Sequence, residues 1–208
     1  MTLDQFRPLA DRLLDPFVGA ADSVGLTPDG VSVIAFGFAV AAGVAFAIAD
    51  PLYYALGALF VFLNGWLDLL DGALARRQNV ASDGGDLLDH VLDRYADIAV
   101  IVGLALGISE NGGLVLGLAA VTGVLMTSYL GTQIQAVGLG RQYGGLLGRA
   151  DRLALIGIAG VAAAVVPSPF ISVGPLNLGI VGLLLVLFAV VGHITALQRF
   201  WGAWSDLR

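Results

Sequence analysis

The strongest constraint on this chain is a series of long apolar stretches, each close to the length that crosses a lipid bilayer. A transmembrane helix needs about 20 consecutive, mostly apolar residues. Only 12% of the 208 residues are charged, about half the share that is usual in soluble domains. We therefore expect an all-α integral membrane protein with six transmembrane helices. They are predicted at Val31–Ala49, Leu52–Leu67, Leu87–Ile108, Gly113–Val137, Leu153–Val166 (extended back to about Gly148) and Leu176–Leu197.

The segment before these stretches has a different pattern. Apolar residues recur there at helical spacing, with charged residues between them, which is typical of a helix lying in the plane of the membrane interface. Thr27-Pro28 then predicts the start of the first transmembrane helix, as a capping residue followed by a first-turn proline. We expect an amphipathic interfacial helix in residues 1–25 and a six-helix transmembrane domain in residues 26–208. The apolar face is Leu3, Phe6, Ala10, Leu13 and Phe17.

The arginines predict the orientation in the membrane. Basic residues are enriched in cytoplasmic loops. With the N-terminus inside, the loops near Asp50, near Glu110 and at 167–175 are external, and none of them contains a basic residue. Both termini are therefore expected in the cytoplasm of a multi-pass cell-membrane protein. The arginines on that side are Arg7, Arg12, Arg76, Arg77, Arg141, Arg149, Arg152, Arg199 and Arg208, and Arg94 lies about two turns into the third span from it.

The charged interval after the second apolar stretch carries the chemistry. Six of the 16 acidic residues fall between Asp68 and Asp93. On a helix, Asp68 and Asp71 are neighbours on one face, and so are Asp89 and Asp93. The linker Gln78–Gly85 is long enough to turn the chain back, so the two faces can meet. Ionised carboxylates are costly inside a membrane, and four that converge suit hard divalent cations, Mg²⁺ or Mn²⁺. Metal sites of this kind usually serve phosphoryl transfer.

The same interval resembles the signature of the CDP-alcohol phosphotransferase family. It reads D-x2-D-G-x2-A-R-x8-G-x3-D-x3-D, with every residue type and spacing matched. The six-span layout with an amphipathic N-terminal helix also matches that family over most of the chain. The positions of the motif are Asp68, Asp71, Gly72, Ala75, Arg76, Gly85, Asp89 and Asp93.

The resemblance implies an enzyme of phospholipid biosynthesis. Asp68, Asp71, Asp89 and Asp93 would hold two metal ions against the diphosphate of a CDP-linked lipid, and Asp93 would also act as general base on the acceptor hydroxyl. That oxygen attacks the lipid-side phosphorus, and CMP leaves. The family likeness also implies a homodimer. The residues expected beside the nucleotide are Gly72, Ala75, Arg76 and Gly85.

A second basic region, with Arg141, Arg149 and Arg152, predicts where the acceptor binds. Arg149 and Arg152 are three residues apart, so both guanidinium groups can address one anion. The order Ser128-Tyr129 and then Gly148-Arg149-x2-Arg152 is similar to the branch of the family that takes phosphorylated polyols. That branch commonly has basic residues where this chain has Gly131 and Gln133. Inositol phosphate and glycerol phosphate both remain candidate acceptors, and the alternative reading of these arginines is contact with lipid phosphate.

Several other assignments remain open at this level. Serine could replace the phosphorylated acceptor. An intramembrane prenyltransferase would also use aspartates and Mg²⁺, and Asn64-x3-Asp68 weakly fits one, while a divalent-cation carrier would place its carboxylates near the membrane midplane. Asp97 is expected to be a buried ion-pair partner. A net charge of −6 argues against nucleic acid. The absence of lysine in an acidic chain is typical of halophiles, which favours CDP-archaeol over CDP-diacylglycerol as donor.

Overall fold

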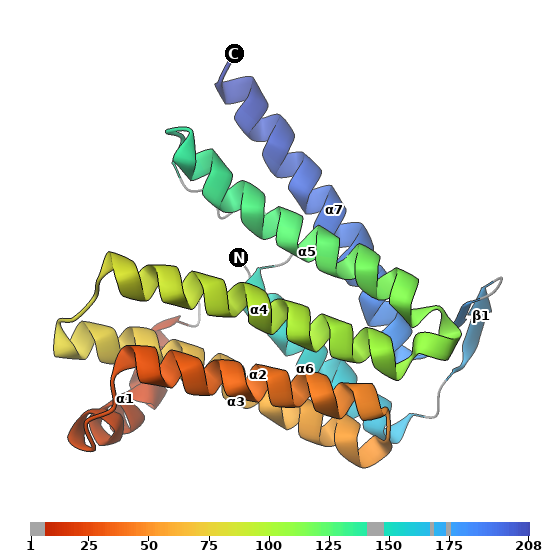
Figure 1. Cartoon of the computed structure of the whole chain (residues 1–208), viewed down its shortest axis with the longest axis horizontal. Coiled ribbons are helices and arrows are strands. Elements are labelled where there is room, and N and C mark those ends of the chain that lie inside the picture. The colour runs from red at the N-terminus through yellow and green to blue at the C-terminus, as the bar shows by residue number, and fades with distance from the viewer. Residues whose placement is uncertain (1–6, 141–147, 167–168, 174–175) are drawn as a thin grey trace.

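The part of the chain that the structure describes is almost entirely helical. The structure, a computed structural model, describes residues 7–140, 148–166, 169–173 and 176–208. Helices α2 to α7 correspond to the six apolar stretches, so the expected all-α architecture is confirmed in outline (Figure 1). The helices are α1 (Arg7–Ser23), α2 (Pro28–Ile48), α3 (Pro51–Gln78), α4 (Asp83–Gly107), α5 (Gly113–Ala136), α6 (Arg149–Val165) and α7 (Ile180–Asp206), with a 3-10 turn η2 (Ser109–Asn111) before α5.

The prediction that Leu176–Leu197 is one helix is wrong at its beginning. Leu176–Leu178 forms strand β2, which pairs antiparallel with β1 (Ile171–Val173) in the register Ile171 to Leu178. The helix α7 begins only after Gly179 and continues well past Leu197, to Asp206. Hydropathy alone does not separate a short apolar strand from the first turn of an apolar helix, because both bury the same side chains.

Four helices among the described residues are long and apolar enough to cross a membrane, namely α2, α3, α5 and α7. Helix α6 is shorter, with 17 residues. Helix α4 has the length, but the charged residues of the motif gather in its first half. The membrane character of the chain is thus supported, and the six predicted spans remain a prediction. The charged residues of α4 are Asp83, Asp86, Asp89, Asp93, Arg94 and Asp97.

Helix α2 packs against both of the helices that carry the aspartates, α3 and α4. Its contact with α4 is close enough for backbones to touch, and it depends on glycine at two facing positions. A Cβ built on Gly43 would lie 2.4 Å from the carbonyl oxygen of Ala99, and one built on Gly103 would lie 2.1 Å from the carbonyl oxygen of Gly43. Small residues allow this kind of approach between membrane helices. The contact holds α4 at a fixed depth along α2.

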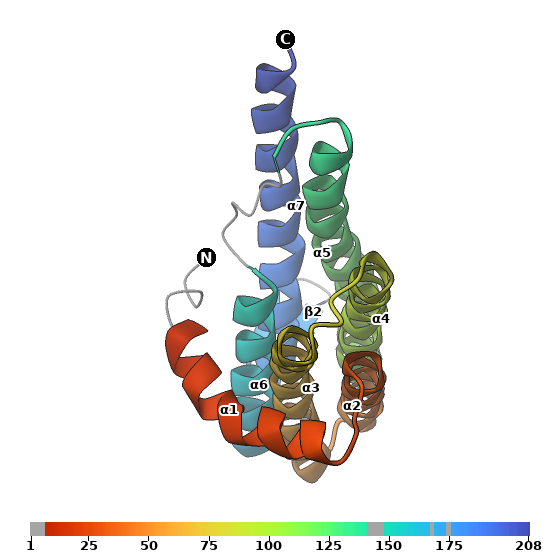
Figure 2. The ribbon, with the colours of Figure 1, turned by 90° about the vertical axis from the view of Figure 1, so that its left-hand side faces the viewer.

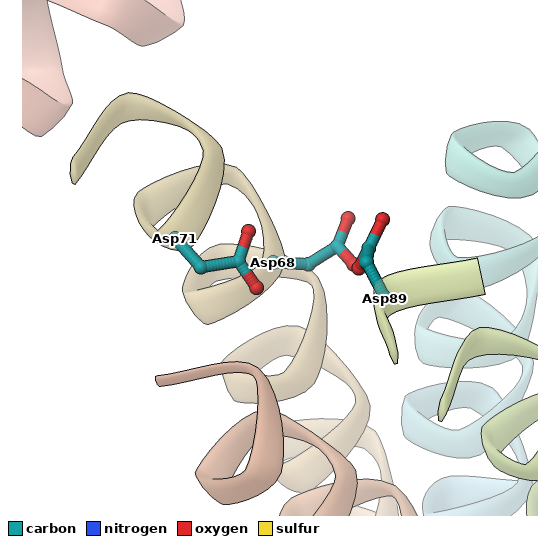
Figure 3. A group of neighbouring side chains, drawn as sticks. All are labelled: Asp68, Asp71 and Asp89. Carbon is teal, nitrogen blue, oxygen red and sulfur yellow. The ribbon is translucent and has the colours of Figure 1, made fainter. Parts of the chain in front are cut away.

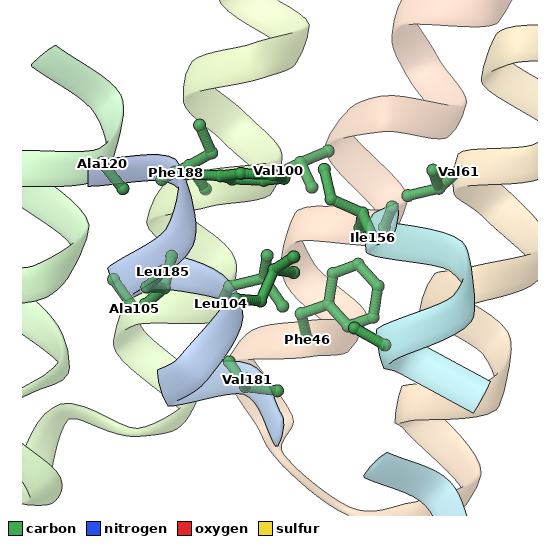
Figure 4. Packing of buried hydrophobic residues seen from close by; sticks show 14 of the residues in the cluster. Phe46, Val61, Val100, Leu104, Ala105, Ala120, Ile156, Val181, Leu185 and Phe188 are labelled. Atoms are coloured by element: carbon green, nitrogen blue, oxygen red, sulfur yellow. The ribbon is translucent and has the colours of Figure 1, made fainter. Parts of the chain in front are cut away.

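The hydrophobic core lies where helices α2 to α7 meet (Figure 4). Phe46 and Leu185 are fully buried there, and Phe188 is almost so. In both views of the ribbon, α5 lies beside α7, and Figure 1 shows this pair running at an angle to α2, α3 and α4. The core therefore holds the helices together along part of their length. The site is built from the helix ends that the predicted orientation places on the cytoplasmic side.

Helix α1 docks on the end of α3 that carries the aspartate motif. Its buried face is Leu14, Val18 and Ala21, packed with Val31, Leu70 and Leu74. Figure 2 shows α1 lying crosswise to α2, α3 and α4, and its place at a membrane interface stays a prediction. Leu13 and Phe17, predicted on its apolar face, are more than half exposed.

A polar contact reinforces this docking. The Oδ1 of Asp22 accepts a hydrogen bond from Gln78 Nε2 at 3.0 Å, and its Oδ2 accepts one from Arg77 Nε at 3.2 Å. The amide donor of Gln78, and then the guanidinium of Arg77, lower the pKa of Asp22 below its usual value. Asp22 thus ties the C-terminal end of α1 to the last turn of α3.

Candidate active site

Three of the four predicted metal-binding aspartates converge in the structure. Asp68 and Asp71 lie one turn apart on α3, and Asp89 approaches from α4 (Figure 3). One ligand oxygen from each lies within 4.8 Å of the others, which is a spacing that can hold a metal ion. Asp71 is buried, and the other two are partly exposed. A set of carboxylate oxygens at this spacing fits a hard divalent cation such as Mg²⁺ or Mn²⁺.

The fourth predicted ligand, Asp93, joins this group through an arginine. Arg149, the first residue of α6, donates from Nη1 to Asp68 and from Nη2 to Asp93 Oδ1, the latter at 2.6 Å. Arg94 lies on the other side of Asp93, at 3.6 Å from its Oδ2. Asp93 therefore belongs to the same electrostatic cluster, although it is outside the tight group of three.

Ser32 is a residue of this site that sequence reasoning missed. It lies on the second turn of α2, and its Oγ is 2.6 Å from Asp71 Oδ2 and 3.1 Å from the Pro28 carbonyl oxygen. A hydroxyl has one hydrogen, and the shorter contact to a charged acceptor is the stronger one. Ser32 thus orients the most buried carboxylate of the cluster. Its one signal in the sequence is a small polar side chain near the start of an apolar helix.

The second predicted acceptor arginine, Arg152, is held in a buried ion pair. Its Nη2 donates to Asp97 Oδ2 at 2.8 Å, and both side chains are almost fully buried. Arg94 lies 3.7 Å from the same Asp97 oxygen. The prediction that Asp97 is a buried ion-pair partner is confirmed. Arg141, the third predicted acceptor residue, lies outside the described residues.

The predicted nucleotide-binding residues line the helix ends next to the aspartates. Gly72 follows Asp71 directly, and a Cβ on it would lie 3.5 Å from Arg76 Nη1. Gly85 is on the first turn of α4, where Ser82 caps the helix through the Gly85 N–H at 3.1 Å. Ala75 lies one turn beyond Asp71. These positions stay predictions, and the structure keeps them within one region of α3 and α4.

A cavity of about 2190 Å³ adjoins the aspartate cluster. Asp68, Asp93, Arg149 and Arg152 line its polar part together with Ser128, and the sequence did not predict two further polar groups there, which are Arg94 and Arg199. Arg94 donates to Ser128, and Arg199 donates to the Thr127 carbonyl oxygen at 2.6 Å. Arg199 was treated only as a topology signal, because nothing local in the sequence connects it with residues on α5.

Most of the remaining cavity wall is apolar. Much of this apolar part comes from α3 and α6, two helices that pack against each other. Several of these side chains are exposed, as Phe62 and Ile158 are. A ligand in this cavity would meet charge at one end and hydrocarbon at the other. The apolar lining includes Leu59, Phe62, Trp66, Leu153, Gly157, Ile158 and Val161.

Asn64, which gave weak support to a prenyltransferase, has a structural role instead. It is 2% exposed, and its Nδ2 donates to the Ala35 carbonyl oxygen of α2 at 2.9 Å. The side chain therefore links α3 to α2.

Comparison with known proteins agrees with this geometry. Residues 25–194 match the family model described as CDP-alcohol phosphatidyltransferase. The chain is 31% identical to archaetidylinositol phosphate synthase of Methanothermobacter thermautotrophicus over 206 residues, which cover 99% of this chain and 96% of that protein. It is 32% identical to phosphatidylinositol phosphate synthase of Mycobacterium marinum over 199 residues, or 94% and 81% of the two chains.

The fold has a solved counterpart. The Mycobacterium tuberculosis phosphatidylinositol phosphate synthase PgsA1, in a crystal structure with CDP-DAG bound, superimposes with a TM-score of 0.77 at 28% identity. The match covers 93% of this chain and 94% of that one. Another crystal structure of PgsA1, in complex with manganese and citrate, gives the same TM-score of 0.77.

Proposed function

The chain belongs to the CDP-alcohol phosphatidyltransferase family, and on that premise we propose which reaction it performs. It transfers a phosphatidyl- or archaetidyl-type group from a CDP-linked lipid to the hydroxyl of a phosphorylated polyol, and it releases CMP. One observation carries this proposal, namely the cavity that joins the aspartate cluster to arginines at one end and to an apolar wall at the other. Such a cavity suits a donor with lipid tails and a diphosphate together with an anionic acceptor.

Asp68, Asp71, Asp89 and Asp93 hold the divalent cations, two Mg²⁺ or Mn²⁺ ions in this proposal. When bound, the ions neutralise the bridging diphosphate and make CMP a good leaving group. The carboxylates of the described cluster have the spacing for this task, and a related enzyme, PgsA1, has been crystallised with manganese. Gly72, Ala75, Arg76 and Gly85, next to the cluster, are proposed to accommodate the nucleotide.

Asp93 is proposed as the general base. It lines the cavity, and Arg94 lies 3.6 Å from its Oδ2, which helps to orient the carboxylate. It takes the proton of the acceptor hydroxyl as that oxygen forms a bond to the lipid-side phosphorus. The bond from this phosphorus to the bridging oxygen breaks, and CMP leaves with the electron pair.

The acceptor binds at the arginine end of the cavity. Arg149 and Arg152 are proposed for its phosphate, with Arg141 on the preceding segment, and Arg199 lines the same end. Inositol phosphate is favoured over glycerol phosphate, because the related enzymes from M. thermautotrophicus and M. marinum are named for inositol phosphate lipids. The names of these relatives also leave archaeol and diacylglycerol donors both open.

The topology proposed for this reaction has six spans and an active site at the cytoplasmic face of the cell membrane. Helices α4 and α6 pack against α2 and α3, two of the helices with the length and hydropathy of membrane spans, and α1 lies across the aspartate end. The chain has no cysteine, so single cysteines at Ser82 and Ser109 can be tested directly. An impermeant maleimide should label Ser82→Cys only from the cytoplasmic side, and Ser109→Cys only from outside.

The decisive experiment measures CMP release from purified protein with Mg²⁺ and either CDP-archaeol or CDP-diacylglycerol. The acceptor panel contains inositol phosphate, glycerol phosphate, serine and unphosphorylated inositol. We expect CMP with a phosphorylated polyol and none with serine or free inositol. Release with serine alone would overturn the acceptor assignment, and no release with any acceptor would overturn the reaction. The homodimer proposed from the family is tested by chemical cross-linking in native membranes.

A further inference from the structure

Arg149 contacts two of the proposed metal-binding aspartates at once. Its Nη1 contacts Asp68, a member of the tight carboxylate group on α3, and its Nη2 contacts Asp93 on α4. These are charge-assisted hydrogen bonds, the strong kind. A guanidinium that binds both carboxylates competes with any cation that needs the same oxygens. The contacts of Arg149 with the metal-binding aspartates are thus separate from its proposed role in acceptor binding.

Arg149 and Arg152 lie one turn apart on α6, and the structure treats them differently. Arg152 pairs with Asp97, which belongs to no proposed metal site, and that pair is deeply buried. The Arg149 side chain is 17% exposed and faces carboxylates that have a second possible partner. The buried Nε of Arg149 also has no hydrogen-bond partner among the described residues. One of its donors is therefore unused in this position, which a second binding position could satisfy.

The surroundings of Arg149 leave room for such a movement. It is the first residue of α6, where its side chain can change rotamer without disturbing the helix behind it. It also lines the large cavity, at the end where Arg199 and Ser128 lie. If the Arg149 guanidinium left Asp68 and Asp93, it would remain in the same cavity, within the region proposed for the acceptor phosphate.

We propose that Arg149 is a placeholder cation, whose guanidinium competes with divalent cations for Asp68 and Asp93 and is released toward the acceptor when they bind. Four carboxylates carry four negative charges, so two divalent cations neutralise them and remove the electrostatic attraction for the guanidinium. The freed arginine then prefers a dianionic phosphate. The site would load metal before acceptor. The release toward an acceptor rests on the proposed function, whereas the competition for the carboxylates does not.

The test measures Mn²⁺ affinity of the purified full-length chain without substrates, from the electron paramagnetic resonance signal of free Mn²⁺. Removing the competitor in Arg149→Gln should tighten Mn²⁺ binding about tenfold, since hydrogen bonds to charged groups are among the stronger ones. Arg149→Lys keeps the charge but cannot bridge two carboxylates, so its affinity should fall between those of Arg149→Gln and the parent chain. Arg77→Gln removes the same charge from α3, where the partners are Asp15 and Asp22, and should leave Mn²⁺ affinity unchanged.

Unchanged or weaker Mn²⁺ binding in a folded Arg149→Gln would overturn the placeholder role. If that variant does not fold, Arg149→Lys decides, and an affinity equal to that of the parent chain overturns the role. The outcome is independent of catalysis. CMP release with a phosphorylated acceptor but no change in Mn²⁺ affinity would leave the proposed function intact and reject the placeholder. Tighter Mn²⁺ binding without CMP release, whichever acceptor is supplied, would support the placeholder role and reject the proposed function.

Discussion

Replacing Ser32 by alanine tests whether the cation site depends on a residue outside the aspartate motif. Ser32 donates to Asp71 at 2.6 Å, and the hydroxyl and the carboxylate are both buried. Ser32→Ala deletes this donor. The carboxylate then loses the contact that fixes its rotamer, so one ligand of the cluster is no longer pre-oriented.

The size of the effect follows from the kind of bond. A hydrogen bond to a charged group contributes about 2 kcal/mol, which corresponds to about thirtyfold in an equilibrium constant. That agrees with the loss of about 10–100-fold in metal affinity that is typical when a hydrogen-bond partner of a metal ligand is removed. We therefore expect Ser32→Ala to weaken Mn²⁺ binding about thirtyfold and to raise by a similar factor the Mg²⁺ concentration needed for half-maximal CMP release.

Two control variants make the result specific. Ser32→Thr keeps the hydroxyl, and its affinity should stay close to that of the parent chain. Ser23→Ala deletes a hydroxyl that bonds only to the Ala20 carbonyl oxygen on α1, and it should change nothing at the cation site. Thermal unfolding in detergent separates a local effect from general loss of structure. Parent-like Mn²⁺ affinity in a stable Ser32→Ala protein would show that Asp71 is oriented by the helix alone.

Three further predictions test other parts of the structure. Asp93→Asn should abolish CMP release. The affinity for the CDP-lipid, measured by equilibrium binding of labelled donor, should stay within about threefold of the parent value, well short of the tenfold that 1.4 kcal/mol corresponds to. Substantial turnover would exclude Asp93 as the base. Gly43→Ala should destabilise the fold by about 1–3 kcal/mol, because its Cβ would lie 2.4 Å from the Ala99 oxygen, whereas Gly37→Ala on the same helix meets nothing within 4 Å; equal unfolding midpoints would contradict the close α2–α4 contact. The pKa of Asp22 is lowered, so its contacts with Gln78 and Arg77 stabilise α1 above pH 3.8 and are lost as the pH falls below that value. Hydrogen exchange in α1 of the parent chain should therefore become faster in acid. In Asp22→Asn, exchange in α1 should be faster already at neutral pH.

The sequence was sufficient for the parts of the site that lie within one helix. Helical periodicity alone puts Asp68 beside Asp71, and the short linker after Gln78 brings Asp89 back to them. Ser32 and Arg149 come from α2 and α6, and their contacts with the aspartates depend on how these helices pack. No local pattern encodes that packing, since apolar helices in a membrane have few polar contacts to fix their rotation.

The same limit explains two differences between the predicted and the observed structure, one at strand β2 and one on helix α1. Leu176 and Leu178 are as apolar as the residues of the helix that follows, and the pairing of this segment with Ile171–Val173 makes it a strand. On α1, Leu13 and Phe17 belong to a wide apolar face, of which the part at Leu14 and Val18 is buried against α3. Hydropathy predicts that a surface avoids water, but it does not say whether lipid or protein covers it.

Three acids and three arginines of the site alternate in one chain of contacts. The contacts run from Asp68 through Arg149 to Asp93, then through Arg94 to Asp97 and Arg152. A lone carboxylate would be costly inside an apolar helix bundle, whereas Asp68, Asp93 and Asp97 each lie beside an arginine.

Two of the three arginines in this chain of contacts come from the first turn of α6. The packing of α6 on α3 is therefore as important for the site as the aspartate motif itself, since it places Arg149 beside Asp68 and Asp93, and Arg152 beside Asp97. In the proposed reaction the same turn also binds the acceptor phosphate. Neutralising the aspartates and recognising the acceptor would then depend on one structural element, and a change in the position of α6 should alter metal affinity and acceptor preference together.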